Sequence, residues 1–199
     1  MSREIIAILR GVTPDEVLPI ADAIRAAGID KIEVPLNSLN AFDSIEKLAV
    51  AHGSEALVGA GTVLTVEDAQ RVQNVGGAMV VSPDCNVDVI AKTKALGMQS
   101  YPGVLTPTEA FTALRTGADG LKFFPASLVG PSGLKAMLAV LPVGCKTYAV
   151  GGAGPDNFAD WFAAGITGFG IGTAIYKPGD GADMVAKKAA AIVVAYDAG

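Results

Sequence analysis

The stretch TPTEAFTALRTGADGLKFFP (106–125) holds one complete helix-and-strand unit, and this unit decides the fold. Thr106 and Pro107 are typical of a helix start, because a threonine oxygen caps the first turn and proline fits the first helical position. Gly117 is typical of a helix end. The apolar run GLKFFP (120–125) then predicts a short buried strand. A helix followed closely by a buried strand is the repeating unit of proteins with a parallel sheet.

The same unit recurs along the chain with a period of roughly 20 to 27 residues. Helical patterns that end on glycine occupy 13–28, 66–77 and 154–165. The first of these opens on Thr-Pro, as 106–117 does, so we expect Thr13 to cap its helix. Strands are expected at 4–10, 31–36, 56–63, 79–83, 99–104, 120–125, 146–152 and 168–173.

Eight strand-and-helix units in 199 residues predict an α/β protein of the (β/α)8 TIM barrel type, whose lower size limit is ~200 residues. The competing architecture is an open doubly wound sheet. That fold carries a GxGxxG turn after its first strand, whereas here the first strand ends in Arg10-Gly11. We therefore expect one compact barrel domain over residues 1–199, without a second domain or a large lid.

The composition excludes several classes of protein. A hydrophobic fraction of 51% and a charged fraction of 18% indicate a well-buried globular chain. A net charge of -5 without a basic cluster argues against a nucleic-acid partner. No apolar run approaches the ~18 residues of a membrane span, and the N-terminal apolar run is too short for a secretion signal.

The residues that usually bind metals are few and scattered. Cys85 and Cys145 lie far apart, in neither a metal-ligand nor a redox spacing, and are expected to be free thiols in the core or in loops. His52 is the single histidine, placed where Gly53 closes a helix, and it fits the helix C-terminus. We expect a reduced cytoplasmic protein without a metal site.

In a barrel, the functional side chains lie at the C-terminal ends of the strands. The residues at these expected ends are Arg10, Glu33, Thr62, Pro83, Lys122, Gly151, Gly152, Gly172 and Thr173. Lys122 interrupts an apolar run, so it either extends its amine to water or belongs to a site that needs an amine. A lysine in an apolar pocket loses its proton easily and becomes a nucleophile that forms a Schiff base with a carbonyl.

The neighbours of Lys122 at the barrel mouth suggest the rest of the chemistry, each with an alternative. Glu33 is either an acid/base catalyst or a buried ion-pair partner of Lys122. Arg10 could bind a carboxylate through two hydrogen bonds, or be a surface arginine. Thr62 follows two glycines and could turn its hydroxyl into the pocket.

Two glycine turns end the last two strands, AVGG (149–152) and GIGT (170–173). Backbone N–H groups at this place in a barrel often bind phosphate, and Thr173 adds a hydroxyl donor. Glycines can also serve only to fit tight barrel corners. Two such turns on adjacent strands favour the phosphate site.

The motifs ILRG, IEVPLNS, VGAGTV, PG, LKFFPAS and AVGG occur in this order between Ile5 and Tyr176. In order and spacing the chain resembles the KDPG/KHG family of class I aldolases, which act on 2-keto-3-deoxy-6-phospho sugar acids. The resemblance implies a homotrimeric barrel with Lys122 as the Schiff-base lysine and Glu33 as the acid/base. Arg10 and Thr62 would hold the substrate carboxylate. The substrates would be a phosphorylated keto sugar acid and pyruvate, and no dissociable cofactor is needed.

One position departs from part of that family. In its phosphogluconate-type members the residue before the Gly-Gly turn is typically threonine, which can touch the substrate hydroxyl at carbon 4. Here that residue is Val150, so we expect a preference for the opposite epimer at carbon 4, unless Val150 only packs beneath the turn. A sugar-phosphate isomerase or epimerase, or a non-catalytic phosphate-binding barrel, remains an alternative at this point.

Overall fold

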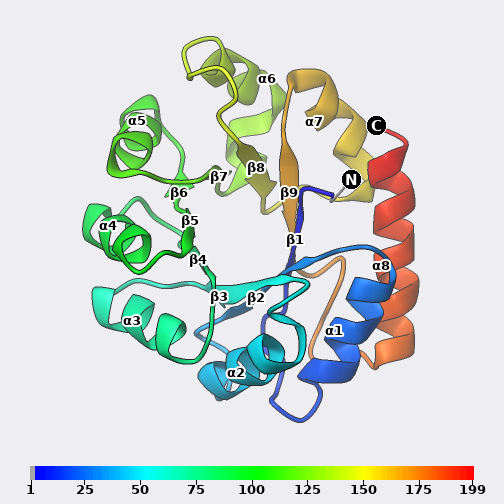
Figure 1. Cartoon of the computed structure of the whole chain (residues 1–199). Coiled ribbons are helices and arrows are strands. Elements are labelled where there is room, and N and C mark those ends of the chain that lie inside the picture. The colour runs from blue at the N-terminus through cyan, green and yellow to red at the C-terminus, as the bar shows by residue number, and fades with distance from the viewer. Residues whose placement is uncertain (1–2) are drawn as a thin grey trace.

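The computed structural model describes residues 3–199 and forms a barrel of parallel strands ringed by helices (Figure 1). The strands are β1 (Ile5–Ile8), β2 (Lys31–Pro35), β3 (Leu57–Gly61), β4 (Met79–Val81), β5 (Gln99–Tyr101), β6 (Gly103–Val104), β7 (Leu121–Phe123), β8 (Thr147–Val150) and β9 (Gly168–Ile171). The helices are α1 (Val17–Ala26), α2 (Ala41–His52), α3 (Val66–Asn74), α4 (Val87–Ala95), α5 (Pro107–Thr116), α6 (Ala126–Leu138), α7 (Phe158–Ala164) and α8 (Ala182–Asp197), with a short 3-10 helix at Pro155–Asn157.

The sheet closes through one interrupted strand. Its order is β5-β4-β3-β2-β1-β9-β8-β7-β6, and the two end strands β5 and β6 are consecutive pieces of the chain separated only by Pro102. The first piece pairs with β4 and the second with β7. The prediction of one continuous strand over 99–104 was therefore wrong, because proline has no N–H to continue the ladder. The expected (β/α)8 barrel is confirmed, with the fifth strand in two pieces.

The two Thr-Pro segments behave differently. Thr106 caps α5 as predicted and forms a capping box with Glu109. Thr13 does not cap a helix: its carbonyl accepts from the N–H groups of Glu16 and Val17, and α1 begins only at Val17. The reason is Pro19. A helix that began at Thr13 would place this proline in the interior, where it lacks a donor N–H, whereas the later start leaves it in the first turn.

Apolar side chains form two separate cores. The larger one lies between the strands and the surrounding helices. The smaller one fills the barrel interior and consists of Ile6, Ile8, Met79, Val81, Tyr101, Tyr148 and Val150. Opposite these large side chains, β3 and β9 present glycines such as Gly59, Gly61 and Gly170, because a Cβ at any of them would clash with a neighbour. The interior is thus packed, and the charged residues buried among its strands are Glu33 and Lys122 in the middle of β2 and β7 and Lys31 at the start of β2.

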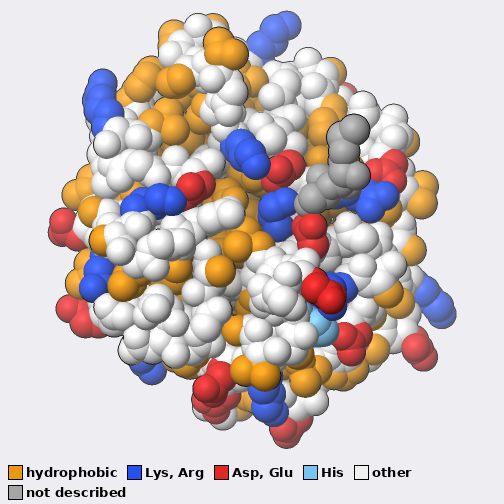
Figure 2. Space-filling model, in the orientation of Figure 1, with side chains coloured by type: hydrophobic (Ala, Val, Ile, Leu, Met, Phe, Trp, Pro, Cys, Tyr) orange, Lys and Arg blue, Asp and Glu red, His pale blue; other side chains and the backbone are white. Residues whose placement is uncertain are grey.

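Several smaller predictions agree with the structure. His52 is the last residue of α2, and both Cys85 and Cys145 are half-buried free thiols in loops. Among residues 3–199, no helix is long and apolar enough to cross a membrane. The face of the molecule in Figure 2 carries acidic and basic side chains close together near the barrel centre.

Candidate active site

Lys122 and Glu33 meet inside the barrel. Lys122 is the middle residue of β7 and Glu33 the middle residue of β2, and their side chains are 7% and 2% exposed. Both line one inner cavity of about 10 Å³, with Tyr101 and Tyr148 among its other walls. Such a volume holds about one water molecule. The amine and the carboxyl group therefore face the same small space.

The surroundings of Lys122 disfavour its charged form. Burial lowers the pKa of Lys122, the positive charge of Arg10 lowers it further, and only the charge of Glu33 opposes this. The amine also lies 4.7 Å from the centre of the Phe124 ring, whose face attracts an ammonium weakly but accepts no conventional hydrogen bond from it. A neutral amine is the nucleophilic form of lysine, so this environment suits attack on a carbonyl carbon.

The pKa of Glu33 is shifted in the opposite direction to that of Lys122. Burial raises the pKa of Glu33 to about 7, although Lys122 and Arg10 pull it down. Its Oε2 atom is buried without a hydrogen-bond partner among the described residues. The carboxyl group fits because Gly61 has no side chain, since a Cβ there would lie 1.9 Å from Oε2. A carboxyl group that titrates near neutral pH can both take and give a proton.

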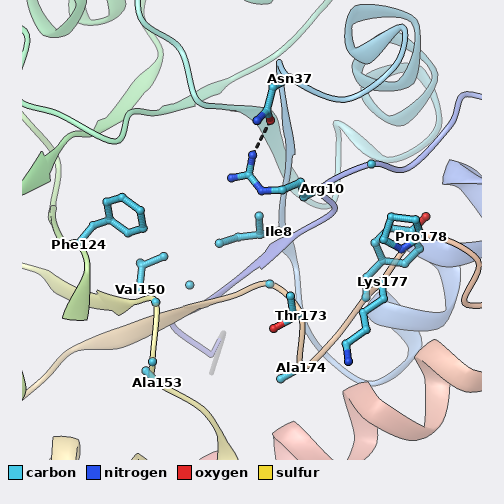
Figure 3. Close-up of a pocket in the computed structure, with 16 residues that line it drawn as sticks. Ile8, Arg10, Asn37, Phe124, Val150, Ala153, Thr173, Ala174, Lys177 and Pro178 are labelled. Atoms are coloured by element: carbon cyan, nitrogen blue, oxygen red, sulfur yellow. Dashed lines mark hydrogen bonds between the residues drawn. The ribbon is translucent and has the colours of Figure 1, made fainter. Parts of the chain in front are cut away.

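A larger cavity of about 410 Å³ opens above this centre at the C-terminal ends of the strands (Figure 3). The two cavities share the walls Ile8, Val150 and Gly170. Of the residues predicted at the strand ends, this mouth is lined by Arg10, Val150, Gly151, Gly152, Gly172 and Thr173. Its volume is in the range of small-molecule sites. The structure thus brings the Lys122 amine, the Glu33 carboxyl group and these residues into two adjoining cavities.

The Gly151-Gly152 turn has φ values of 81° and 92°. Only glycine adopts these angles readily, and a Cβ on Gly152 would also lie 2.8 Å from the Cβ of Ser127. The turn therefore needs both glycines for its backbone angles and Gly152 also for packing, whatever it binds. Gly172 and Thr173 follow β9 on the same wall of the mouth cavity, and Thr173 is exposed there.

Arg10 is held in place by a residue that the sequence analysis did not single out. Its Nη1 donates to Oδ1 of Asn37 at 2.5 Å, and both residues line the mouth cavity (Figure 3). The signal for Asn37 was present, because IEVPLNS continues past the end of β2 into the mouth. Lys177 and Phe124 also line the mouth and were likewise missed. Lys177 lies in the loop after β9, where no periodic pattern marks a residue.

Two predicted residues lie outside both cavities. Thr62 follows β3 with a φ of 56°, a left-handed angle that is rare for a β-branched residue. Pro83 follows β4, and its carbonyl lies against Gly103. Neither residue lines the inner or the mouth cavity, so a substrate contact for Thr62 and Pro83 stays a prediction.

Comparison with known proteins agrees with this geometry. The family model described as KDPG and KHG aldolase matches residues 1–188. The chain belongs to the KDPG and KHG aldolase family. It is therefore an aldolase, a carbon–carbon lyase.

Curated relatives of this aldolase match it over nearly their whole length. It is 48% identical to a probable 2-dehydro-3-deoxy-6-phosphogalactonate aldolase of Rhizobium meliloti (strain 1021), over 100% of this chain and 93% of the relative. It is 45% identical to the 2-dehydro-3-deoxy-6-phosphogalactonate aldolase of Escherichia coli (strain K12), over 96% of this chain and 94% of the relative. A solved structure described as native KDPGal superposes with a TM-score of 0.98 at 44% identity and covers 100% and 96% of the two chains.

Proposed function

We propose that this aldolase cleaves 2-dehydro-3-deoxy-6-phosphogalactonate to pyruvate and D-glyceraldehyde 3-phosphate through a Schiff base on Lys122. The observation that carries the mechanism is the buried Lys122 amine, which shares a cavity of about 10 Å³ with a carboxyl group whose pKa is raised to about 7. The two relatives named for the galactonate compound support the substrate.

The reaction follows from these two groups. The neutral Lys122 amine attacks carbon 2 of the keto acid, and loss of water leaves an iminium ion that acts as an electron sink. Glu33, directly or through the one water that the cavity can hold, takes the proton from the hydroxyl at carbon 4. The bond between carbons 3 and 4 breaks and releases the aldehyde. The remaining enamine takes a proton at carbon 3, and hydrolysis then frees pyruvate and the amine.

The mouth cavity provides the groups for the two charged ends of the substrate. Arg10, oriented by Asn37, would pair with the carboxylate next to the reacting carbon. The turn at Gly151 and Gly152, with Gly172 and Thr173, would bind the phosphate at the far end. We also assign Thr62 to the carboxylate and Pro83 to the substrate wall, although neither lines a cavity in this structure. The site needs no cofactor.

Val150 bears on which epimer is preferred. Its side chain is 7% exposed and lines both cavities, so it lies where the chain around carbon 4 would pass. A valine methyl cannot hydrogen-bond a hydroxyl, which disfavours the gluconate epimer by about a factor of two to ten. We therefore propose a modest preference for the galactonate compound, with the gluconate compound still accepted.

We further propose that the enzyme acts in the cytoplasm as a homotrimer. A designed cage described as built by fusing symmetric oligomeric domains supports assembly, since one of its chains superposes with a TM-score of 0.97 at 44% identity over 100% of this chain. Exposed apolar side chains such as Leu128 and Val194, 73% and 70% exposed, are also available for contacts between subunits.

Covalent trapping tests the proposal. Pyruvate with borohydride should add one reduced adduct per chain, located by mass spectrometry on the peptide that contains LKFFPAS. Lys122→Ala and Lys122→Arg should abolish it, and an adduct on another lysine would overturn the assignment. Cleavage should also survive EDTA. An isomerase or a binding protein would form no adduct, and activity restored by a divalent ion would indicate metal-assisted chemistry.

A further inference from the structure

Two tyrosines form the lower wall of the inner cavity, on the side away from the mouth. Tyr101 and Tyr148 are 2% and 1% exposed and line the same space as Lys122. Tyr148 on β8 is the register partner of Lys122 on β7. The two rings meet edge to face with their centres 5.3 Å apart. Both rings therefore border the cavity that the amine faces.

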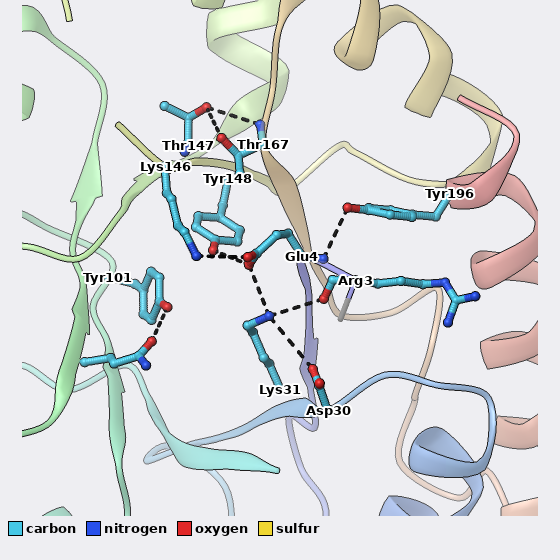
Figure 4. Close-up of polar contacts among 11 residues, drawn as sticks. Arg3, Glu4, Asp30, Lys31, Tyr101, Lys146, Thr147, Tyr148, Thr167 and Tyr196 are labelled. Carbon is cyan, nitrogen blue, oxygen red and sulfur yellow. Dashed lines mark hydrogen bonds and ion pairs between the residues drawn. The ribbon is translucent and has the colours of Figure 1, made fainter. Parts of the chain in front are cut away.

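Both hydroxyl groups point toward the N-terminal end of the barrel. The Tyr148 hydroxyl donates to Oε2 of Glu4 at 2.7 Å, and the Tyr101 hydroxyl donates to Oε1 of Gln99 at 2.5 Å. Glu4 immediately precedes β1, and Gln99 begins β5, so both acceptors lie at that end. Each tyrosine thus spans the distance from the reaction cavity to the polar end of the barrel (Figure 4).

Glu4 is itself fixed by two lysines. Lys146 donates to its Oε1 at 2.9 Å, and Lys31 lies 3.1 Å from its Oε2 (Figure 4). Burial alone would raise the pKa of Glu4, but hydrogen bonds from Tyr148, Lys146 and Lys31 lower it to about 2. The carboxylate therefore remains ionised at neutral pH and holds the Tyr148 hydroxyl in one direction.

The rings also pack tightly against the backbone. A Cβ on Gly120 would lie 2.9 Å from Tyr148 and 3.0 Å from Tyr101. At this position even a methyl group would press on both rings, so the rings pack directly against the backbone, and little of either ring reaches solvent. The two rings thus form the wall of the inner cavity on its N-terminal side, and Ile8, Val150 and Gly170 separate it from the mouth cavity.

We propose that Tyr148, held by Glu4, and Tyr101, held by Gln99, are positioning residues that close the reaction cavity on its N-terminal side and keep bulk water from the Lys122 amine. This inference rests on the proposed role of Lys122. Neither ring takes part in bond making. Their contribution is to keep the amine desolvated, which is the largest cause of its lowered pKa.

Charged groups face the two tyrosines and Lys122 from both ends of the barrel. The charged and titratable groups that face it are Arg10 and Glu33 on the mouth side, and Glu4, Lys31, Lys146 and Asp119 on the N-terminal side. Of these, Glu33 raises the pKa of Lys122 and Arg10 lowers it. A change in the tyrosines that leaves these two in place therefore reports on water access.

The test is the titration of the Lys122 amine in Tyr148→Ala. NMR of protein with labelled lysine side chains follows the amine without any substrate, and Lys122→Arg assigns its signal. Opening the cavity from below should raise the Lys122 pKa by about one unit or more, because water relieves the desolvation. The rate of borohydride trapping with pyruvate should shift to higher pH by the same amount. Tyr148→Phe keeps the ring and should titrate close to the wild type.

Circular dichroism checks that each variant is folded. If Tyr148→Ala does not fold, Tyr148→Leu keeps apolar bulk at the site and should shift the titration in the same direction by less. A folded Ala or Leu variant with the wild-type titration would overturn the inference. Absence of any wild-type adduct would instead overturn the proposed function, so the two failures are distinguishable.

Discussion

Gly61 leaves free the space that the Glu33 carboxyl group occupies, since a Cβ on Gly61 would lie 1.9 Å from Oε2 and 2.4 Å from Oε1. The two residues come from neighbouring strands, and the register pairs Glu33 with Gly59 and Pro35 with Gly61. The position of the proposed acid/base group therefore depends on a glycine that carries no functional group of its own.

Gly61→Ala should displace the Glu33 carboxyl group and lower kcat by about tenfold to a hundredfold. This loss is part of the roughly 10²–10⁴-fold rate enhancement that general acid–base catalysis supplies. The measurement is steady-state cleavage, with circular dichroism to confirm the fold. Gly181→Ala is the matched control, because nothing lies within 4 Å of a Cβ at Gly181. Equal rates in the two variants would show that the position of Glu33 does not limit the reaction.

Glu33→Gln should keep the fold and most of the substrate affinity but lower kcat by about 10²–10⁴. The amide has the shape of the carboxyl group but cannot accept and return a proton. Borohydride trapping with pyruvate should still label Lys122, which separates imine formation from bond cleavage. Near-normal cleavage by this variant would mean that another group moves the proton.

The same substitution should change the pH dependence of stability. The folded-state pKa of Glu33 is raised from 4.5 to about 7, so the folded state holds this proton more tightly than the unfolded state. The resulting stability is fully present below pH 4.5 and is lost as the pH rises to about 7. Removing this cost should make Glu33→Gln more stable than the wild type at pH 8 by roughly 1–3 kcal/mol. Urea unfolding at pH 8 and at pH 4 measures it, and a difference that does not shrink at pH 4 would contradict the prediction.

Glu4→Gln should show the opposite sign. The Glu4 pKa is lowered from 4.5 to about 2, so its carboxylate stabilises the fold above pH 4.5, and this contribution is lost as the pH falls through 2. At pH 7 we expect the variant to be less stable by on the order of 2 kcal/mol. Urea unfolding between pH 7 and pH 2 checks this, with the exposed Glu46→Gln as control. A loss of the same size in the control would assign the effect to net charge.

Val150→Thr should shift the ratio of kcat/KM toward the gluconate epimer by about a factor of two to ten, because one hydroxyl adds one hydrogen bond to the substrate. Parallel assays with both epimers measure the ratio. The variant keeps the size of the side chain, which matters because Val150 also belongs to the interior core. An unchanged ratio would place the stereochemical preference elsewhere in the pocket.

The sequence alone determined the barrel and pointed to its buried pair, Lys122 and Glu33. Eight apolar runs alternate with amphipathic, glycine-terminated segments, and this periodicity predicts parallel strands whose ends meet at one mouth. Lys122 and Glu33 were identifiable because a charge inside a buried strand has a large desolvation cost. Such residues stand out against their neighbours in a single sequence.

Tertiary structure alone decided what surrounds that pair. Glu4, Lys31 and Lys146 lie at the starts of three separate strands and look like ordinary charges there, yet both lysines and the Tyr148 hydroxyl converge on the Glu4 carboxylate. Likewise, Asn37 becomes informative only once Arg10 lies beside it. The pKa of a buried group depends on burial and on charges from distant parts of the chain, and closure of the barrel brings those parts together.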